Sequence, residues 1–202
     1  MDLSKTALLT VDLQNDFLHP EGAYGRAGQG APEIAALPAR LKPLVDLLKA
    51  RGGWFVSTQF TLVPVRGEPM IAPHLKKLRP FLCAGDFAPG AWGNQLVDEL
   101  GPADVVVEKI AYSAFYQTRM EWTLRKLGIE HLLVAGIVTN GGVATTFRAA
   151  HVREFDAILL EDGCAAFSPK THDEAVQALR PVGRVASIAE IMAEIAAGPG
   201  AA

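Results

Sequence analysis

Short runs of apolar residues recur along the chain, and each run ends where polar or charged residues begin. The runs are nearly continuous and rich in valine, leucine and isoleucine, with little alternation of apolar and polar positions. This pattern is typical of strands that are buried on both faces, as they are in a parallel sheet. We therefore predict about six such strands. They are expected at Ala7–Val11, Trp54–Val56, Val105–Val107, Leu132–Val138, Ala157–Leu160 and Arg184–Ile188.

Segments with helical spacing of apolar residues lie between these runs. Ile34–Ala50 predicts a long helix, in which Pro38 and Pro43 indicate a late start or a kink. Another helix is expected from about Gly142 to Val152. Ser/Thr-x-x-Glu patterns predict capping boxes at the starts of further helices, and they begin at Thr118, Thr171 and Ser187.

The alternation of strands and helices predicts an α/β fold. We expect a three-layer, doubly wound, Rossmann-type sheet of mainly parallel strands with helices on both faces. The length of 202 residues favours one domain over residues 1–202. The irregular, proline-rich segment Gln59–Trp92 is expected to wall a pocket, and the tail Ala196–Ala202 is expected to fray.

Composition and charge exclude several classes of partner. The chain has 19 basic and 22 acidic residues, a net charge of −3 and no run of like charges, so we expect no nucleic-acid partner. No apolar run is long enough for a membrane span, and the first residues lack the pattern of a signal peptide. The two cysteines, Cys83 and Cys164, fit neither a disulfide framework nor a zinc motif. These features favour a cytoplasmic protein with no nucleic-acid or membrane partner.

Candidate reactive residues stand where the predicted strands end, because ligands of open α/β sheets bind at the carboxyl ends of the strands. Asp12 ends the first strand and Lys109 follows the third. A nearby lysine favours the ionised carboxylate and burial opposes it, and either form can serve in acid–base catalysis. A strand-end aspartate is also often a helix cap, and a strand-end lysine is often solvated, so position alone leaves both readings open.

Further polar residues follow other strands, namely Thr58-Gln59 and Glu161-Asp162. The sequence Thr139-Asn140-Gly141-Gly142 follows the fourth strand and opens a predicted helix. Bare backbone N–H groups at two such glycines suit an anion or an oxyanion. A tight turn that needs glycine for steric reasons would give the same pattern.

Motifs in the right order resemble the isochorismatase-like, or cysteine hydrolase, family. They are Leu8–Phe17 with Asp12, Glu108–Thr118 with Lys109, and Val134–Thr146, and Glu161–Ala165 also fits. The match runs from about residue 5 to residue 190, which is nearly the whole chain. The resemblance implies that Asp12 and Lys109 are catalytic.

The nucleophile of that family is missing from this chain. In most members the third motif supplies a cysteine that attacks an amide or a related carbonyl, and here Gly142 stands at that position. True isochorismatases are similar in carrying glycine there while they keep the aspartate and the lysine. They cleave a vinyl ether by protonating its methylene carbon, after which water captures the oxocarbenium ion. This resemblance implies that Asp12 is a general acid, that Lys109 binds a carboxylate or tunes Asp12, and that no cofactor is needed.

The resemblance also makes predictions about the pocket. Metal-binding amidases of the family carry Asp-x-His after the second strand, where this chain has Thr58–Thr61, so no metal site is expected. The histidines, which show no ligand spacing, support that expectation. A cis peptide bond is implied at Ile137–Val138. Substrate contacts are implied at Gln59, Val138, Gly141 and Gly142.

Some positions depart from the isochorismatase pattern. Val138 stands where an aromatic residue is usual, and Ile110-Ala111 replaces a Trp-Arg pair. Arg66 is a candidate ligand for a substrate carboxylate, although its spacing from Gln59 does not match. These departures put the isochorismate substrate itself in question.

Three functions are open at this point. The first is a metal-independent hydrolase that acts with Asp12 and Lys109 on a small, anionic vinyl ether such as isochorismate or a relative. The second is an amidohydrolase of the cysteine hydrolase type whose nucleophile is absent, by nature or by engineering. The third is a non-catalytic binding protein on the same fold. The resemblance also implies a homo-oligomer, in which a neighbouring subunit can complete the pocket.

Overall fold

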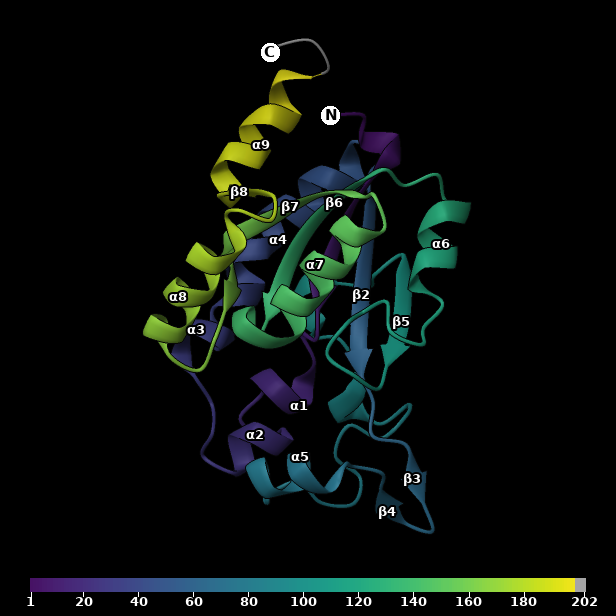
Figure 1. The fold of residues 1–202 in the computed structure, drawn as a ribbon, viewed down its shortest axis with the longest axis vertical. Coiled ribbons are helices and arrows are strands. Elements are labelled where there is room, and N and C mark those ends of the chain that lie inside the picture. Colours follow the sequence, from purple (N-terminus) through teal and green to yellow (C-terminus); the bar gives the residue numbers. More distant parts are fainter. Residues whose placement is uncertain (199–202) are drawn as a thin grey trace.

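The structure is a computed structural model that describes residues 1–198, so the end of the predicted frayed tail, 199–202, lies outside the described residues. Its centre is a sheet with the strand order β5-β2-β1-β6-β7-β8, in which every pair of neighbours is parallel (Figure 1). The predicted doubly wound α/β fold is confirmed. The strands are β1 (Thr6–Val11), β2 (Trp54–Phe60), β5 (Val105–Lys109), β6 (His131–Ile137), β7 (Asp156–Ala165) and β8 (Arg184–Ala186).

Each predicted strand is present, but three of them, β2, β5 and β7, run further than their apolar cores. β2 continues through Thr58 and Gln59, which pair in register with Val107 and Glu108 of β5. β7 continues through Glu161-Asp162 because its pairing with β6 resumes after an irregularity between Val134 and Gly136. The polar residues expected after these strands therefore lie within them.

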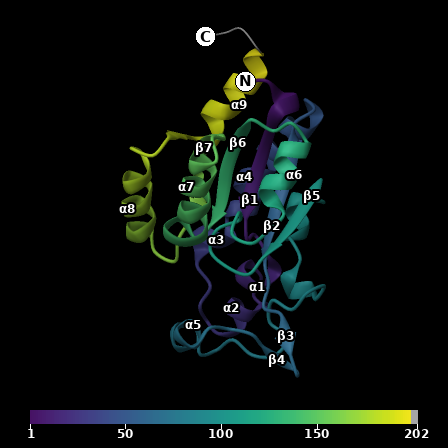
Figure 2. The same cartoon turned by 45° about the vertical axis from the view of Figure 1, so that its right-hand side comes forward.

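Helices cover both faces of the sheet (Figure 2). Successive side chains of a strand point to opposite faces, so Leu8 and Leu9 of β1 enter two different hydrophobic cores. The core around Leu8 packs against α4 (Leu37–Ala50) and α9 (Ile188–Ala197). The core around Leu9 packs on the opposite face, against α6 (Met120–Lys126), α7 (Ala144–Val152) and α8 (Pro169–Leu179).

Proline divides the long helix that the sequence predicts before β2. A short helix, α3 (Pro32–Ala35), precedes α4, and Pro38 lies in the first turn of α4. Proline is tolerated there because the first N–H groups of a helix have no partner within it. Pro43 lies inside α4, which still continues to Ala50.

Of the predicted capping boxes, one is present as such. The Ser187 side chain accepts a hydrogen bond from the Glu190 N–H, and the Glu190 side chain accepts one from the Ser187 N–H. α8 begins earlier than predicted, because Ser168 caps it and Thr171 is already helical. Thr118 accepts a hydrogen bond from the Met120 N–H but precedes the cap position of α6.

Short elements beyond the carboxyl ends of the strands form the lower part of Figure 1. They pack around a third hydrophobic cluster that includes Tyr24, Leu82 and Phe87. Within residues 1–198, no helix is long and apolar enough to cross a bilayer. Labelled in this lower part are α1 (Asn15–Leu18), α2 (Ala23–Arg26), β3 (Pro64–Val65), β4 (Glu68–Pro69) and α5 (Pro73–Leu78). The remaining short elements of the described chain are η1 (Leu3–Lys5), which precedes β1, η2 (Trp92–Asn94), η3 (Asp98–Leu100) and the π-helical turn η4 (Thr139–Val143).

Candidate active site

Asp12 is the residue that directly follows β1, and its backbone is left-handed, with a φ of 58°. Non-glycine residues in this conformation are uncommon and cluster at functional sites, and aspartate is among those that tolerate it best. The Thr58 hydroxyl on β2 donates a hydrogen bond to Asp12 Oδ1 at 2.8 Å. The same hydroxyl accepts one from the Asp12 N–H at 3.2 Å. Thr58 therefore holds both the backbone and the carboxyl group of Asp12.

Lys109 ends β5 and reaches across the end of β2 to the same carboxyl group. Its Nζ lies 2.6 Å from Asp12 Oδ2, and the two side chains are only 1% and 7% exposed. The ammonium group also donates to the Ala111 carbonyl at 2.9 Å and lies 5.4 Å from the centre of the Phe60 ring. The structure thus joins the two residues predicted as the reactive pair in a buried ion pair.

Burial acts strongly on the acid–base behaviour of this pair. It raises the pKa of the Asp12 carboxyl above its ordinary value, while Lys109 and Thr58 act in the opposite direction. A carboxyl group in this setting keeps a proton at a higher pH than an exposed aspartate does. This property suits a general acid.

β6 brings a glycine turn beside the pair. The peptide bond between Ile137 and Val138 is cis, as predicted, and the turn η4 follows it. A Cβ atom at Gly142 would lie 3.5 Å from Asp12 Oδ2 and 3.0 Å from the Ile137 carbonyl oxygen. A side chain at position 142 would therefore begin beside the carboxyl group, and glycine leaves that space open.

Another glycine, on β6 itself, permits the close approach of β6 to β1. Gly136 has a φ of 112°, and a Cβ atom there would lie 2.2 Å from the Val11 carbonyl oxygen. No real side chain fits such a gap, and the backbone conformation itself favours glycine. Gly136 therefore lets β6 pass close to β1 immediately before Asp12.

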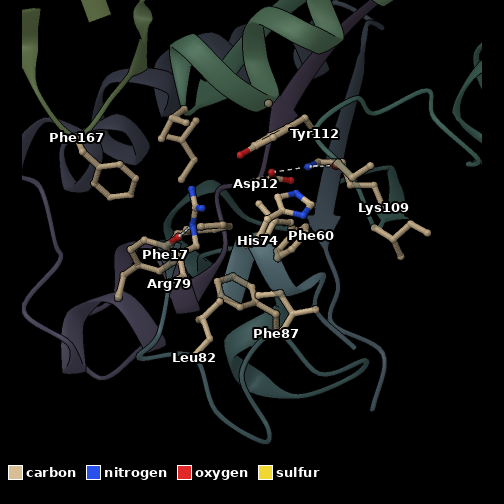
Figure 3. Close-up of a pocket in the computed structure, with 18 residues that line it drawn as sticks. Asp12, Phe17, Phe60, His74, Arg79, Leu82, Phe87, Lys109, Tyr112 and Phe167 are labelled. Carbon is tan, nitrogen blue, oxygen red and sulfur yellow. Dashed lines mark hydrogen bonds and ion pairs between the residues drawn. The ribbon is translucent and has the colours of Figure 1, made fainter. Parts of the chain in front are cut away.

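A cavity of about 240 Å³ opens in front of Asp12, Lys109 and Gly142 (Figure 3). Most of its surface is apolar, which is typical of pockets that bind small molecules through a few placed polar groups. Aromatic rings supply much of the wall, and they belong to Phe17, Tyr24, Phe60, Phe87, Tyr112 and Phe167.

Arg79 contributes a further charge to the cavity. Its Nε donates a hydrogen bond to the Tyr24 hydroxyl at 2.7 Å. Among residues 1–198 no carboxylate forms an ion pair with Arg79. Figure 3 shows its guanidinium group directed into the cavity, with the Asp12–Lys109 pair across from it in this view. An anionic part of a ligand would find its counter-charge here.

The residues that follow Asp12 in the first motif hold the wall of the cavity. The Gln14 side chain donates to the Phe60 carbonyl at 3.0 Å and accepts from the Phe60 N–H at 2.7 Å. The Asp16 carboxylate accepts hydrogen bonds from the N–H groups of Ala23 at 2.9 Å and Phe87 at 2.6 Å. These side chains act on structure, since buried backbone groups need such partners.

The predicted substrate contacts divide into two groups. Val138 and Gly142 line the cavity, whereas the described lining does not include Gln59 or Gly141. Gln59 is half-buried on β2. A Cβ atom at Gly141 would lie 3.4 Å from the ring of Tyr112.

Residues from the end of the fifth predicted strand lie elsewhere. Asp162 accepts a hydrogen bond from the Ile188 N–H at 2.7 Å, and Glu161 pairs with Arg180 at 2.7 Å. Their expected place at the end of the strand is wrong, because β7 continues past them. Cys164 is buried, which raises the pKa of its thiol, and Cys83 is exposed. Neither cysteine is in the described lining of the cavity.

Sequence reasoning missed Arg79, Tyr24 and Phe167. The candidate arginine, Arg66, lies exposed between β3 and β4, and the arginine that lines the cavity is Arg79. The available signal was the irregular Gln59–Trp92 segment, which predicted a pocket wall but not which side chain would enter the pocket.

The described part of the chain offers no cluster for a metal ion. Within residues 1–198, no group of three or more histidine, cysteine, aspartate or glutamate side chains lies close enough to hold one. Asp12 has Lys109 as its partner, and a lysine ammonium group is not a metal ligand.

Comparison with known proteins places the chain in a family. The sequence model of the isochorismatase domain matches residues 6–190. Ureidoacrylate amidohydrolase RutB from Pantoea ananatis is 33% identical over 179 residues, which cover 82% of this chain and 71% of that protein.

Solved structures share the fold. A cysteine hydrolase from Pseudomonas syringae has a TM-score of 0.83 at 24% identity, covering 98% of this chain and 95% of its own. N-carbamoylsarcosine amidase from Thermoplasma acidophilum has a TM-score of 0.70 at 24% identity, covering 91% and 96%. Fold, site and relatives together define a hydrolase on a doubly wound α/β sheet. The chain belongs to the isochorismatase family.

Proposed function

We propose that this protein is a hydrolase that uses Asp12 and Lys109, without a cysteine nucleophile, on a small anionic substrate that contains a vinyl ether. Isochorismate or a relative is such a substrate. The observation that carries the proposal is the buried Asp12–Lys109 pair beside Gly142, where a Cβ atom would lie 3.5 Å from the carboxylate. Vinyl ether hydrolysis needs an acid and space for the substrate, and this site supplies both.

The reaction begins with protonation at carbon. Asp12 gives its proton to the methylene carbon of the vinyl ether, and the electron pair of the C=C bond forms the new C–H bond. The other carbon of the former double bond becomes electron-deficient. The ether oxygen shares a lone pair with that carbon, which gives the oxocarbenium ion. Water adds to that carbon and returns a proton to the Asp12 carboxylate. The hemiketal then breaks its C–O bond, the departing oxygen takes up the remaining hydroxyl proton, and a keto acid and an alcohol are released.

The neighbours of Asp12 contribute to this reaction in different ways. The Thr58 hydrogen bond orients the carboxyl group, and Lys109 stabilises the carboxylate that forms after the proton leaves. Arg79 binds an anionic group of the substrate from the wall of the cavity. The aromatic rings exclude water from most of the substrate, which strengthens these charge interactions.

Two further properties belong to the proposal. The reaction as written has no step for a metal ion, so we propose a metal-independent enzyme. We also propose a homo-oligomer, supported by exposed Ile110 and Tyr112 at the cavity and by exposed Trp92 and Trp122 elsewhere. Exposed aromatic residues of this kind are common at protein interfaces.

The test compares pyruvate release from isochorismate, and from a simpler 1-carboxyvinyl ether, by the wild type and by Asp12→Asn. Asparagine keeps the shape and the Thr58 contact but has no acidic proton. We expect kcat to fall by about 10²–10⁴-fold. Because Asp12→Asn leaves Lys109 without its counter-charge, the double variant with Lys109→Met provides a second measurement and is expected to be equally inactive. Equal rates in wild type and both variants would remove Asp12 from the mechanism.

Amide hydrolysis is the second candidate, because an amidohydrolase is 33% identical to this chain. The place for a nucleophile is still present at position 142, because a side chain there would begin beside the Asp12 carboxyl group. Gly142→Cys tests this reading, although its Cβ atom must displace the Ile137 carbonyl by a few tenths of an ångström from 3.0 Å. Amidase activity gained by this variant, with no vinyl ether cleavage by the wild type, would favour the second candidate.

A further inference from the structure

The charges that face the cavity form a small set. Asp12 follows β1, Lys109 ends β5, and Arg79 comes from the wall after α5. The other titratable groups in the described lining are the phenols of Tyr24 and Tyr112 and the imidazole of His74. Thr58 adds a hydroxyl group to Asp12 from β2. Asp12 is the only carboxyl group in the described lining, so it is the only internal counter-charge for Lys109 and Arg79 there.

The charges of Asp12, Lys109 and Arg79 do not balance one another. The Asp12 carboxylate and the Lys109 ammonium group cancel each other at 2.6 Å. The guanidinium group of Arg79 has a neutral partner, the Tyr24 hydroxyl, and no acidic one among residues 1–198. A ligand that fills the cavity removes water from these groups, and an uncompensated charge in such a place is costly. One negative charge on the ligand therefore suffices while Asp12 is ionised.

When Asp12 is protonated, more negative charge on the ligand is needed to neutralise the site. When Asp12 holds the proton that it is to donate, Lys109 and Arg79 are both without an internal counter-charge. Two negative charges on the ligand then restore neutrality. The reactive form of the enzyme and a ligand with two carboxylates thus fit each other in charge.

We propose that a substrate with two carboxylates takes up one proton from solvent as it binds, and that this proton enters the site on Asp12. The inference rests on the proposed function, because it concerns the same acid. Binding of the substrate then protonates Asp12, the proposed acid. A substrate with one carboxylate neutralises Arg79 and leaves the Asp12–Lys109 pair ionised, so it binds without protonating Asp12. The site thereby selects its substrate by charge as well as by shape.

The experiment measures protons taken up during binding and needs no turnover. Calorimetric titrations in buffers with different ionisation enthalpies give the number of protons bound per ligand. Two aryl ethers that lack a vinyl group, and so cannot undergo vinyl ether cleavage, serve as probes. 3-(1-Carboxyethoxy)benzoate has two carboxylates, and 2-phenoxypropanoate has one. We expect uptake of about one proton for the first and about none for the second, because linkage ties proton binding to the charge change.

Variants decide where the proton goes. Asp12→Asn should abolish uptake with the dicarboxylate, and uptake that persists would place the proton on another group, such as His74, and overturn the proposal. Arg79→Gln removes one positive charge, so the monocarboxylate should now bind with uptake of about one proton. Arg66→Gln is the matched control, since Arg66 is exposed outside the cavity lining, and it should behave like the wild type.

The outcomes separate this proposal from the proposed function. Equal uptake for both probes, or an Arg79→Gln protein that binds the monocarboxylate with no uptake, contradicts the charge coupling even if vinyl ethers are cleaved. The expected uptake pattern in a protein that cleaves no vinyl ether would leave the coupling in place and remove the proposed reaction.

Discussion

The two sides of the cavity are built by different means. On the sheet side, Asp12 and Lys109 stand at the ends of paired strands, and the turn η4 after β6 brings Gly142 beside them. On the wall side, Arg79 and Phe167 come from irregular segments that are held by side-chain contacts to Tyr24. The sheet side carries the proposed acid and its partner, and the wall side carries the groups that are proposed to face the rest of a substrate. Regular backbone pairing thus positions the first set, and side-chain contacts position the second.

The largest expected difference between the two sides concerns the free energy of unfolding. Lys109→Met leaves a buried carboxyl group without its counter-charge, so stability should fall by about 3–5 kcal/mol in denaturant titrations. Lys5→Met is the matched control, because Lys5 forms an exposed ion pair with Glu130, and it should cost less than about 1 kcal/mol. A similar small loss in both variants would mean that the sheet side does not depend on the ion pair.

The next effect is the dependence on pH. Burial raises the pKa of Asp12, so the protonated acid is lost only when the pH rises through that raised value. We expect kcat/KM for a vinyl ether to fall about tenfold per pH unit above it. The native state also binds this proton more tightly than the unfolded chain does. Stability should therefore decrease as the pH rises from about 3.8 to the raised pKa, and Asp12→Asn should remove that slope. An activity that rises with pH over this range would instead indicate that Asp12 acts as a base.

The smallest effect is expected on the wall side. Phe167 is 43% exposed, and its ring stacks on Tyr24 with centres 5.4 Å apart. Phe167→Ala should lower stability by only about 0.5–1.5 kcal/mol, while KM rises and kcat changes little. Val152→Ala, which removes an exposed apolar side chain outside the cavity, is the control for nonspecific effects. A loss of stability as large as that of Lys109→Met would show that the wall side contributes as much to the free energy of unfolding as the buried ion pair does.

The same division explains what could be predicted from the sequence. Apolar runs that end in Asp12 and Lys109 indicate buried parallel strands, and the ends of such strands converge, so the fold and the proximity of these two residues follow from local pattern. Their proposed catalytic role came from the resemblance to a family. The resemblance to a family added the cis bond at Ile137–Val138, which the structure contains. These features depend on regular backbone geometry.

The wall could not be predicted in the same way. Whether Arg66 or Arg79 enters the cavity depends on long-range contacts, such as the hydrogen bond from Arg79 to Tyr24, that leave no periodic signal in the sequence. Gln59 lies outside the described lining because successive side chains of β2 point to opposite faces, and its neighbour Phe60 is the one that lines the cavity. Irregular segments take their shape from tertiary contacts, so a sequence pattern identifies the segment and not its side-chain directions.

Asp12 is proposed to act as the acid that starts vinyl ether cleavage, with no thiol in the reaction. Pyruvate release from a 1-carboxyvinyl ether tests this role in three proteins: the wild type, a cysteine-free variant with Cys83→Ser and Cys164→Ala, and Asp12→Asn. Thermal unfolding of each protein establishes that it is folded. We expect the cysteine-free protein to keep the rate of the wild type and Asp12→Asn to lose at least about 100-fold. A folded cysteine-free protein that has lost the activity, together with an Asp12→Asn protein that retains it, would show that a thiol and not Asp12 carries the reaction.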